Sequence, residues 1–189
     1  MPRPPVLQTI EWKSVFESGK DYDAWLEAAE SRDNADKMRA RHAAVDLTAQ
    51  AKGFLAALTR PVFIVAIAED WCGDVIRHVP VLRRIEEAAP RLSVRFISRE
   101  QHPNVFVRFL TNGGEAIPKF IFLSDKFVEC GNWGPMPAAC REWIARGKAS
   151  GDVGAARKKV ALLYEADASG AEVARELLHL IDIAASPAP

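Results

Sequence analysis

A run of apolar, mostly β-branched residues, PVFIVAIAE at 61–69, places the strongest constraint on the fold of this chain. The run shows no alternation between apolar and polar residues, which is typical of a strand that is buried on both faces. A helical pattern follows at 73–89 and ends before Pro90, and an alternating strand pattern follows at 92–98. A strand, a helix and a second strand in this order indicate a parallel pair joined by a crossover helix.

The elements expected further along complete an α/β arrangement. The pattern predicts a short helix at 105–114, which the pair Gly113-Gly114 would end. Two strands at 119–124 and 126–133 would form a hairpin across a tight turn at Asp125-Lys126, before a helix at 137–146. The fold class we predict is therefore α/β, with a mixed central sheet flanked by helices.

Helical patterns flank this block on both sides. Residues 11–59 read as helical throughout, with a break and cap expected at 31–34 (SRDN). Two more helices are expected at 155–166 and 169–184, the second with Ser169 as its N-cap. We divide the chain into an N-terminal helical extension (1–60), a central α/β domain (61–148) and a C-terminal helical extension (149–189).

Charge and cysteine content narrow the functional classes. Lys plus Arg and Asp plus Glu number 25 each, so no net field attracts nucleic acid or an anionic membrane surface. The sequence lacks an apolar stretch of signal-peptide or membrane-span length, so we expect a cytoplasmic protein with reduced thiols. Three widely spaced cysteines argue against a disulfide framework, and the histidines show no ligand spacing, so no metal is expected.

Cys72 occupies a position at which thiols become reactive. It follows the apolar strand and opens the next helix, where unpaired backbone N–H groups and the helix dipole favour a thiolate. Asp70 and Asp74 oppose that effect if they lie close, and the sequence leaves the balance open. Cys72 as a small buried apolar residue is the alternative, but its neighbours Trp71 and Gly73 favour the reactive interpretation.

Several motifs occur in an order that indicates a known family. They are WCGD at 71–74, Pro80 eight residues after Cys72, TNGG at 111–114 before Ile117-Pro118, and GNWGPMP at 131–137. In these motifs the block from Pro61 to about Gly147 resembles bacterial thioredoxin-like proteins that carry a Trp-Cys-Gly-Asp-Cys site. The resemblance implies a thioredoxin-like fold for this block.

The resemblance also implies roles for individual residues. Cys72 would be the catalytic nucleophile that attacks a disulfide and forms a mixed disulfide, with Pro118 as a cis proline facing its sulfur. The residues that would contact the substrate or partner are Trp71, Gly73, Asp74, Ile117 and Pro118. No cofactor is implied, although glutathione is a candidate thiol co-substrate.

Two positions depart from the family pattern. Val75 stands where the family has its second, resolving cysteine, so the usual active-site disulfide cannot form. Ala66 stands six residues before Cys72, where thioredoxins have a buried aspartate that accepts the proton of the second thiol. Both replacements affect release of the mixed disulfide, so an outside thiol would have to resolve it.

The remaining candidates favour structural roles. Cys130 is expected in the last strand and Cys140 in the core of the last helix of the block, both too far from Cys72 to bridge to it. His78 is expected to be a surface or packing residue rather than a base. Trp133 is expected to contribute to packing more than to recognition.

Two functions remain open on the sequence alone. The first is a monothiol protein that exchanges disulfides with glutathione or a protein partner, without being an efficient dithiol reductase. The second is a redox-inactive binding module, with a groove around Trp71, Ile117-Pro118 and Trp133 and with terminal helices that could form a homodimer. An iron–sulfur cluster shared between subunits is disfavoured because the Cys-Gly-Phe-Ser motif of monothiol glutaredoxins is absent.

Overall fold

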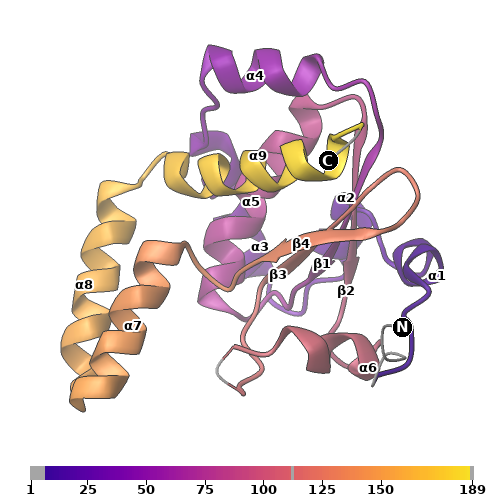
Figure 1. The fold of residues 1–189 in the computed structure, drawn as a ribbon. Coiled ribbons are helices and arrows are strands. Elements are labelled where there is room, and N and C mark those ends of the chain that lie inside the picture. The colour runs from indigo at the N-terminus through magenta and orange to yellow at the C-terminus, as the bar shows by residue number, and fades with distance from the viewer. Residues whose placement is uncertain (1–6, 112, 188–189) are drawn as a thin grey trace.

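The computed structural model describes residues 7–111 and 113–187. Its sheet has four strands in the order β2-β1-β3-β4 (Figure 1). They are β1 (Val62–Ile67), β2 (Leu92–Ile97), β3 (Lys119–Leu123) and β4 (Glu129–Trp133). β1 pairs with β2 in parallel and with β3 antiparallel, and β3 pairs with β4 antiparallel. The predicted mixed α/β sheet is confirmed.

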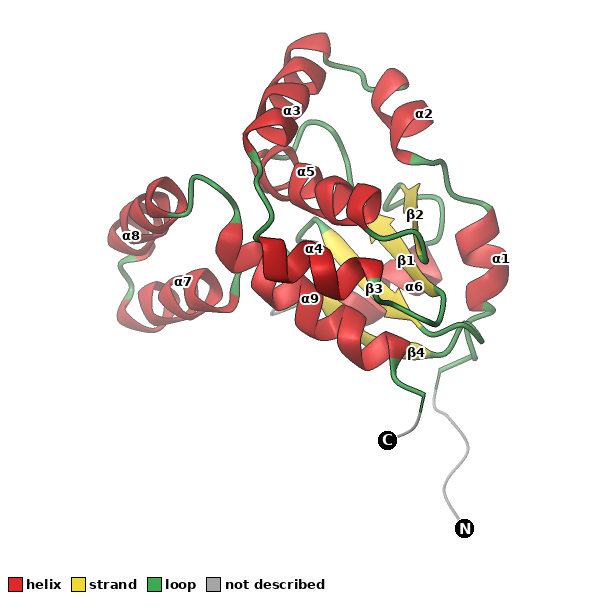
Figure 2. Cartoon of the chain, turned by 90° about the horizontal axis from the view of Figure 1, so that it is seen from above, coloured by secondary structure: helices red, strands yellow, loops and turns green. Residues whose placement is uncertain are grey.

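Helices surround this sheet in the described part of the chain (Figures 1 and 2). Those before β1 are α1 (Trp12–Glu17), α2 (Tyr22–Glu27), α3 (Arg32–Ala44) and α4 (Ala49–Ala56). Those within the α/β block are α5 (Gly73–Ala88), α6 (Pro103–Phe106) with a 3-10 turn at Val107–Phe109, and α7 (Ala138–Ser150). Those at the end are α8 (Val153–Ala166) and α9 (Ala171–Ala185).

The central strand β1 explains how the layers stack. Five of its six residues are fully inaccessible to solvent, because paired strands lie on both sides and helices cover its faces. α5 packs against β2 and against α9, which also covers β3 and β4. α3 and α4 lie against the outer side of α5, and α1 and α2 contact β1 and β2. One continuous core therefore takes side chains from Ile10 to Ala184, including both predicted extensions.

Strand register brings two distant loops together. Ile67, the last residue of β1, pairs with Lys119, the first residue of β3. The segment that follows β1 and the segment that precedes β3 therefore leave the sheet at the same edge. Those segments contain Cys72 and Pro118.

The first 60 residues are less uniformly helical than predicted. Four short helices are separated by turns, and Lys20 pairs with Phe96 at the edge of β2 through two backbone hydrogen bonds of 3.0 and 2.7 Å. The predicted break at 31–34 is confirmed, since the Ser31 side chain caps α3 by accepting from the Asn34 N–H.

Several predicted boundaries were wrong, and the helix expected at 137–146 continues to Ser150. The predicted strand at 126–133 begins only at Glu129, because Phe127 takes a positive φ of 56° in the turn. The helix predicted at 105–114 begins at Pro103, and its last turn ends at Phe109. Gly170, at a φ of 78°, is the N-cap of α9 in place of Ser169, and the Asp167 side chain accepts the Glu172 N–H of the first turn at 3.2 Å. Asn112 of the TNGG motif lies outside the described residues.

α7 and α8 form a hairpin beside the sheet (Figures 1 and 2). The two helices approach closely at Gly147, where an added Cβ would lie 2.4 Å from the Cβ of Ala156. The C-terminal end of α8 then lies near α5, where Tyr164 of α8 contacts the first turn of α5.

We expect Gly134→Ala to destabilise the fold by about 2 kcal/mol or more. Gly134 has a φ of 121°, and an added Cβ would lie 2.0 Å from the carbonyl oxygen of Pro118, so the backbone would have to shift. Urea unfolding measures the loss. Gly53→Ala is the matched control: it lies within α4 with no atom near the added Cβ, and should stabilise the protein by ~0.5–1 kcal/mol. Equal effects of the two substitutions would contradict this account.

Candidate functional site

Cys72 lies at the junction of the two loops that the sheet register brings together. It is the N-cap residue of α5 and is partly buried, and its Sγ donates a hydrogen bond to the carbonyl oxygen of Ile117 at 3.4 Å. The Ile117-Pro118 peptide bond is cis, and both residues are buried. Gly73 is exposed, with open space where its Cβ would be. Thus the structure places Cys72, Gly73, Ile117 and Pro118 together.

Burial decides the balance that the sequence left open at Cys72. Desolvation raises the pKa of the Cys72 thiol above its ordinary value, and the charge of Asp74 adds to this effect. Hydrogen bonds from the backbone N–H groups of Val75 and Asp74, together with the charge of Arg99, act in the opposite direction but do not prevail. In this structure the raising influences outweigh the lowering effect of the helix end on the pKa of Cys72.

The two nearby carboxylates play different roles. Asp70 is buried, and its Oδ2 accepts the backbone N–H of Ser31 at 3.0 Å. Asp74 faces α8, and its Oδ1 accepts a 2.7 Å hydrogen bond from the Tyr164 hydroxyl. Burial raises the pKa of the Asp74 carboxyl, while the Tyr164 hydrogen bond and the charge of Arg77 partly offset that rise.

The side chains of His78, Trp133 and Tyr164 pack together next to the first turn of α5. His78 is 1% exposed, lies edge-on to Trp133 and Tyr164, and places its Nε2 3.3 Å from the Tyr164 hydroxyl. Burial lowers the pKa of His78 to about 3, so the imidazole stays neutral and serves in packing. The Trp133 indole N–H donates to Glu176 of α9 at 2.6 Å, so this residue is fully engaged inside the protein. The predicted packing alternative describes both side chains.

Tyr164 was not among the residues predicted for the site. It lies 90 positions after Asp74, in a helix whose sequence pattern indicates only an amphipathic surface. Arg77 adds a second link, since its guanidinium lies 4.4 Å from the centroid of the Tyr164 ring. No local motif could have identified this contact, because it depends on how the α7–α8 hairpin returns to α5.

Trp71 forms the exposed rim of the site. Its side chain is 55% exposed, and the guanidinium of Arg99 lies 5.1 Å from the ring centroid. Arg99 also forms an ion pair of 3.2 Å with Glu115, in the segment before Ile117. The rim therefore joins the loop after β1, the loop after β2 and the loop before β3.

The other two cysteines are not arranged as partners of Cys72. All three cysteines are free thiols. Cys130 lies on the edge strand β4 and donates to the carbonyl of Val128, whereas Cys140 is buried in α7, where desolvation raises its pKa to about 11. Val75 and Ala66 are both fully inaccessible to solvent. Their surroundings are hydrocarbon, without a thiol or a carboxylate at either position.

Comparison with known proteins agrees with this geometry. A family profile described as thioredoxin matches residues 19–150, which is more than half of the chain. The chain belongs to the thioredoxin-like family. Because the match begins at residue 19, the family pattern includes α2, α3 and α4 as well as the sheet. No curated protein matches this thioredoxin-like sequence.

Two solved structures resemble this thioredoxin-like protein over nearly its whole length. A Pseudomonas aeruginosa protein of unknown function aligns with a TM-score of 0.70 and 16% identity, covering 92% of this chain and 98% of that one. An HIV epitope scaffold aligns with a TM-score of 0.71 and 15% identity, with the same coverage. At such low identity the likeness shows a shared fold alone, and that fold includes most of the flanking helices.

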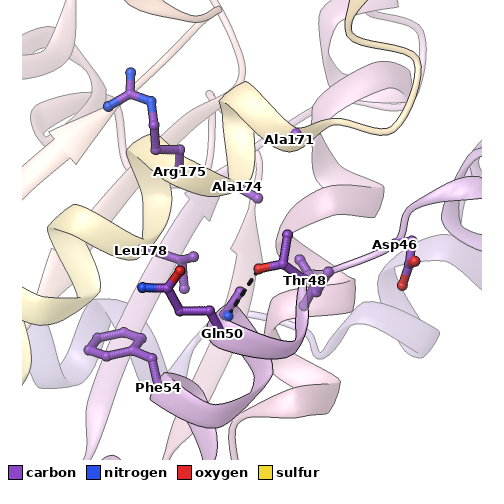
Figure 3. Close-up of a pocket in the computed structure, with 10 residues that line it drawn as sticks. Asp46, Thr48, Gln50, Phe54, Ala171, Ala174, Arg175 and Leu178 are labelled. Carbon is purple, nitrogen blue, oxygen red and sulfur yellow. Dashed lines mark hydrogen bonds between the residues drawn. The ribbon is translucent and has the colours of Figure 1, made fainter.

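A separate hollow of about 330 Å³ lies between α4 and α9 (Figure 3). Asp46 and Leu47 on its wall also face Arg84 and Glu87 near the C-terminal end of α5. Cys72 is at the opposite end of this helix of 16 residues, about 24 Å away along its axis. The Thr48 hydroxyl that points into this region accepts the Ala51 N–H as the cap of α4, so it serves the helix.

Two further features were surveyed over residues 7–111 and 113–187. No group of three or more His, Cys, Asp and Glu side chains in these ranges could hold a metal ion. No helix within them has both the length and the apolar character needed to cross a membrane.

We expect Asp74→Asn to lower the pKa of Cys72 and to speed its alkylation at neutral pH. The wild-type thiol should titrate above a free cysteine, and removal of the negative charge takes away one of the two causes of that rise. The measurement is the pH dependence of alkylation by a haloacetamide, with Cys72→Ser as the blank. Asp36→Asn, an exposed carboxylate on α3, is the matched control and should leave the titration unchanged. A midpoint unmoved by Asp74→Asn would contradict the electrostatic assignment.

Proposed function

We propose that this protein acts in thiol–disulfide exchange through a single cysteine, Cys72, by forming mixed disulfides with glutathione or a protein partner. The Cys72 thiolate attacks one sulfur of a disulfide R–S–S–R; a Cys72–S–S–R bond forms as the R–S–S–R bond breaks. The departing RS⁻ leaves with the electron pair and takes up a proton. An external thiol then attacks the adduct, which restores Cys72 and yields a new disulfide.

The observation that carries this proposal is the placement of Cys72 Sγ against the Ile117 carbonyl, at the start of α5. Two backbone N–H groups point at the sulfur and would stabilise negative charge there in the transition state. Trp71, Gly73 and Pro118 surround this point and would contact the partner, together with the Asp74 and Ile117 backbone. Resolution by an outside thiol fits the hydrocarbon at Val75, and a reducing cytoplasm would supply that thiol.

One observation favours a second function, a redox-inactive binding module. Burial raises the pKa of Cys72, so most of the resting protein carries a neutral thiol at pH 7. In this alternative the exposed Trp71 and the loops beside it would hold a partner, or a second copy of the chain, without covalent chemistry. The two functions differ in whether the sulfur is needed.

Incubation with glutathione disulfide should give a protein that carries one glutathione at Cys72, detected by intact mass. Cys72→Ser should give no adduct at that position, and added glutathione should remove the adduct from the wild-type protein. Cys130→Ser is the matched control, because it removes a partly exposed thiol away from the site and should leave the adduct in place. Absence of a Cys72 adduct would favour the binding module.

Val75→Cys should restore internal resolution. Position 75 lies three residues after Cys72 in the first turn of α5, a spacing at which side chains meet on one helix face. A thiol there could attack the Cys72 mixed disulfide, so the glutathione adduct of Val75→Cys should decay without added thiol, leaving an internal disulfide. The control is Val75→Ser, which places a small hydroxyl side chain at the same position but no thiol. Equal adduct lifetimes in the two variants would contradict this prediction.

A further inference from the structure

A pocket of about 350 Å³ lies beside the segment that holds the Cys72 thiol. One wall is the stretch before Pro118, including Thr111, Glu115 and Ala116. The other is the Pro135-Met136 turn with one face of α7. Ala116 directly precedes Ile117, whose carbonyl accepts from Cys72 Sγ, so the wall is adjacent in the chain to that contact. The volume suits a small molecule rather than a folded partner.

Two cationic side chains, Arg141 and Lys148 of α7, line this pocket. A third, Lys119 at the start of β3, is not part of the lining but shares a hydrogen-bond acceptor with Arg141. The Lys119 ammonium and the Arg141 guanidinium both donate to one acceptor, the carbonyl oxygen of Gly134, at 3.0 and 3.1 Å. Lys119 is 5% exposed, and burial together with the charge of Arg141 lowers its pKa to about 8.

Lys119 and Arg141 lack a carboxylate partner among the residues that the structure describes. Over the ranges 7–111 and 113–187, neither Lys119 nor Arg141 forms an ion pair with a carboxylate, and a carbonyl dipole alone separates them. The one acidic residue on the pocket wall, Glu115, is paired with Arg99 at 3.2 Å. An anion bound in the pocket would supply the counter-charge that half-buried Arg141 lacks among the described residues, beside exposed Lys148 and close to buried Lys119.

We infer that this pocket binds a carboxylate of a small disulfide or thiol that exchanges with Cys72. The inference rests on the proposed function and names its substrate class: a low-molecular-weight, carboxylate-bearing disulfide. The carboxylate would lie near Arg141 and Lys148, while the apolar side chains of Ala116, Met136 and Ile144 would contact the rest of the molecule. The reacting sulfur would then reach Cys72 past Ile117.

Matched disulfide probes test the charge preference. Dithiobis-nitrobenzoate carries two carboxylates and dithiodipyridine carries none, and each releases a chromophore when Cys72 attacks it. Rates are divided by those of free cysteine to remove intrinsic reactivity. We expect the anionic probe to be favoured, and Arg141→Gln and Lys148→Gln each to lower its rate about threefold or more without changing the neutral probe. Lys126→Gln, at the far end of the β3–β4 hairpin, removes the same charge and should have no effect.

A non-covalent titration separates the pocket from the thiol chemistry. S-methylglutathione keeps both carboxylates but cannot exchange, and Cys72→Ser cannot react. Binding of S-methylglutathione to the Cys72→Ser variant should shift the amide NMR signals of Gly114, Ala116 and Met136. Adding Arg141→Gln to that variant should abolish the shifts. Equal probe rates together with no shifts would overturn this inference and leave the proposed function standing. If S-methylglutathione causes the shifts but wild-type Cys72 reacts with neither disulfide probe, the pocket is supported and the exchange function is overturned.

Discussion

The antiparallel pairing of β1 with β3 is the interaction on which the candidate site depends. Because Ile67 lies opposite Lys119, the chain leaves β1 and enters β3 at one edge of the sheet. Cys72 and Ile117 are 45 residues apart in sequence, yet the Sγ of one contacts the carbonyl of the other. A shift of the register by one residue would turn the side chains of β3 to the opposite face and would separate the two loops. The register of β1 with β3 therefore determines both the geometry of the site and the packing of the core.

Burial and helix geometry oppose one another at Cys72. The start of α5 offers N–H donors to the sulfur, whereas the wall of Ile117 and Pro118 keeps water away from it. Asp74 is part of the same balance, since Tyr164 of α8 holds the carboxylate near the helix start with a 2.7 Å hydrogen bond. Three parts of the structure therefore affect the pKa of the thiol: its own helix, the loop before β3 and the α7–α8 hairpin. An exchange partner that adds positive charge or displaces the Ile117 contact would change the pKa of Cys72 directly.

Short sequence patterns predicted the features that depend on neighbouring residues, such as a buried strand and a helix cap. The apolar run at Val62–Ile67 identified the central strand, and Ser31 identified a helix cap, because burial and capping leave marks within a few residues. The cluster of Cys72 with Ile117 and Pro118 came from a resemblance rather than from spacing. Contacts set by tertiary packing escaped prediction: Tyr164 reaches Asp74 from a distant helix, and Lys119 reads as an ordinary strand-end lysine until the turn at Gly134 covers it. Gly170 displaced Ser169 as the cap of α9 because the chain turns there in a left-handed conformation.

The inner and outer sides of the site differ in whether charged side chains are present without a partner of opposite charge. On the inner side, Val75 and Ala66 are sealed in hydrocarbon, and an aspartate at residue 66 without a second thiol to serve would be a buried charge with no partner. In the pattern that the family resemblance implies, the acid serves the second thiol, so a valine at residue 75 and an alanine at residue 66 are consistent with each other. On the outer side, Lys119 and Arg141 share one carbonyl and have no carboxylate among the described residues, an arrangement that costs stability in the empty protein. Arg141 also lines the pocket, so a bound carboxylate, as proposed for the disulfide substrate, would supply the missing counter-charge.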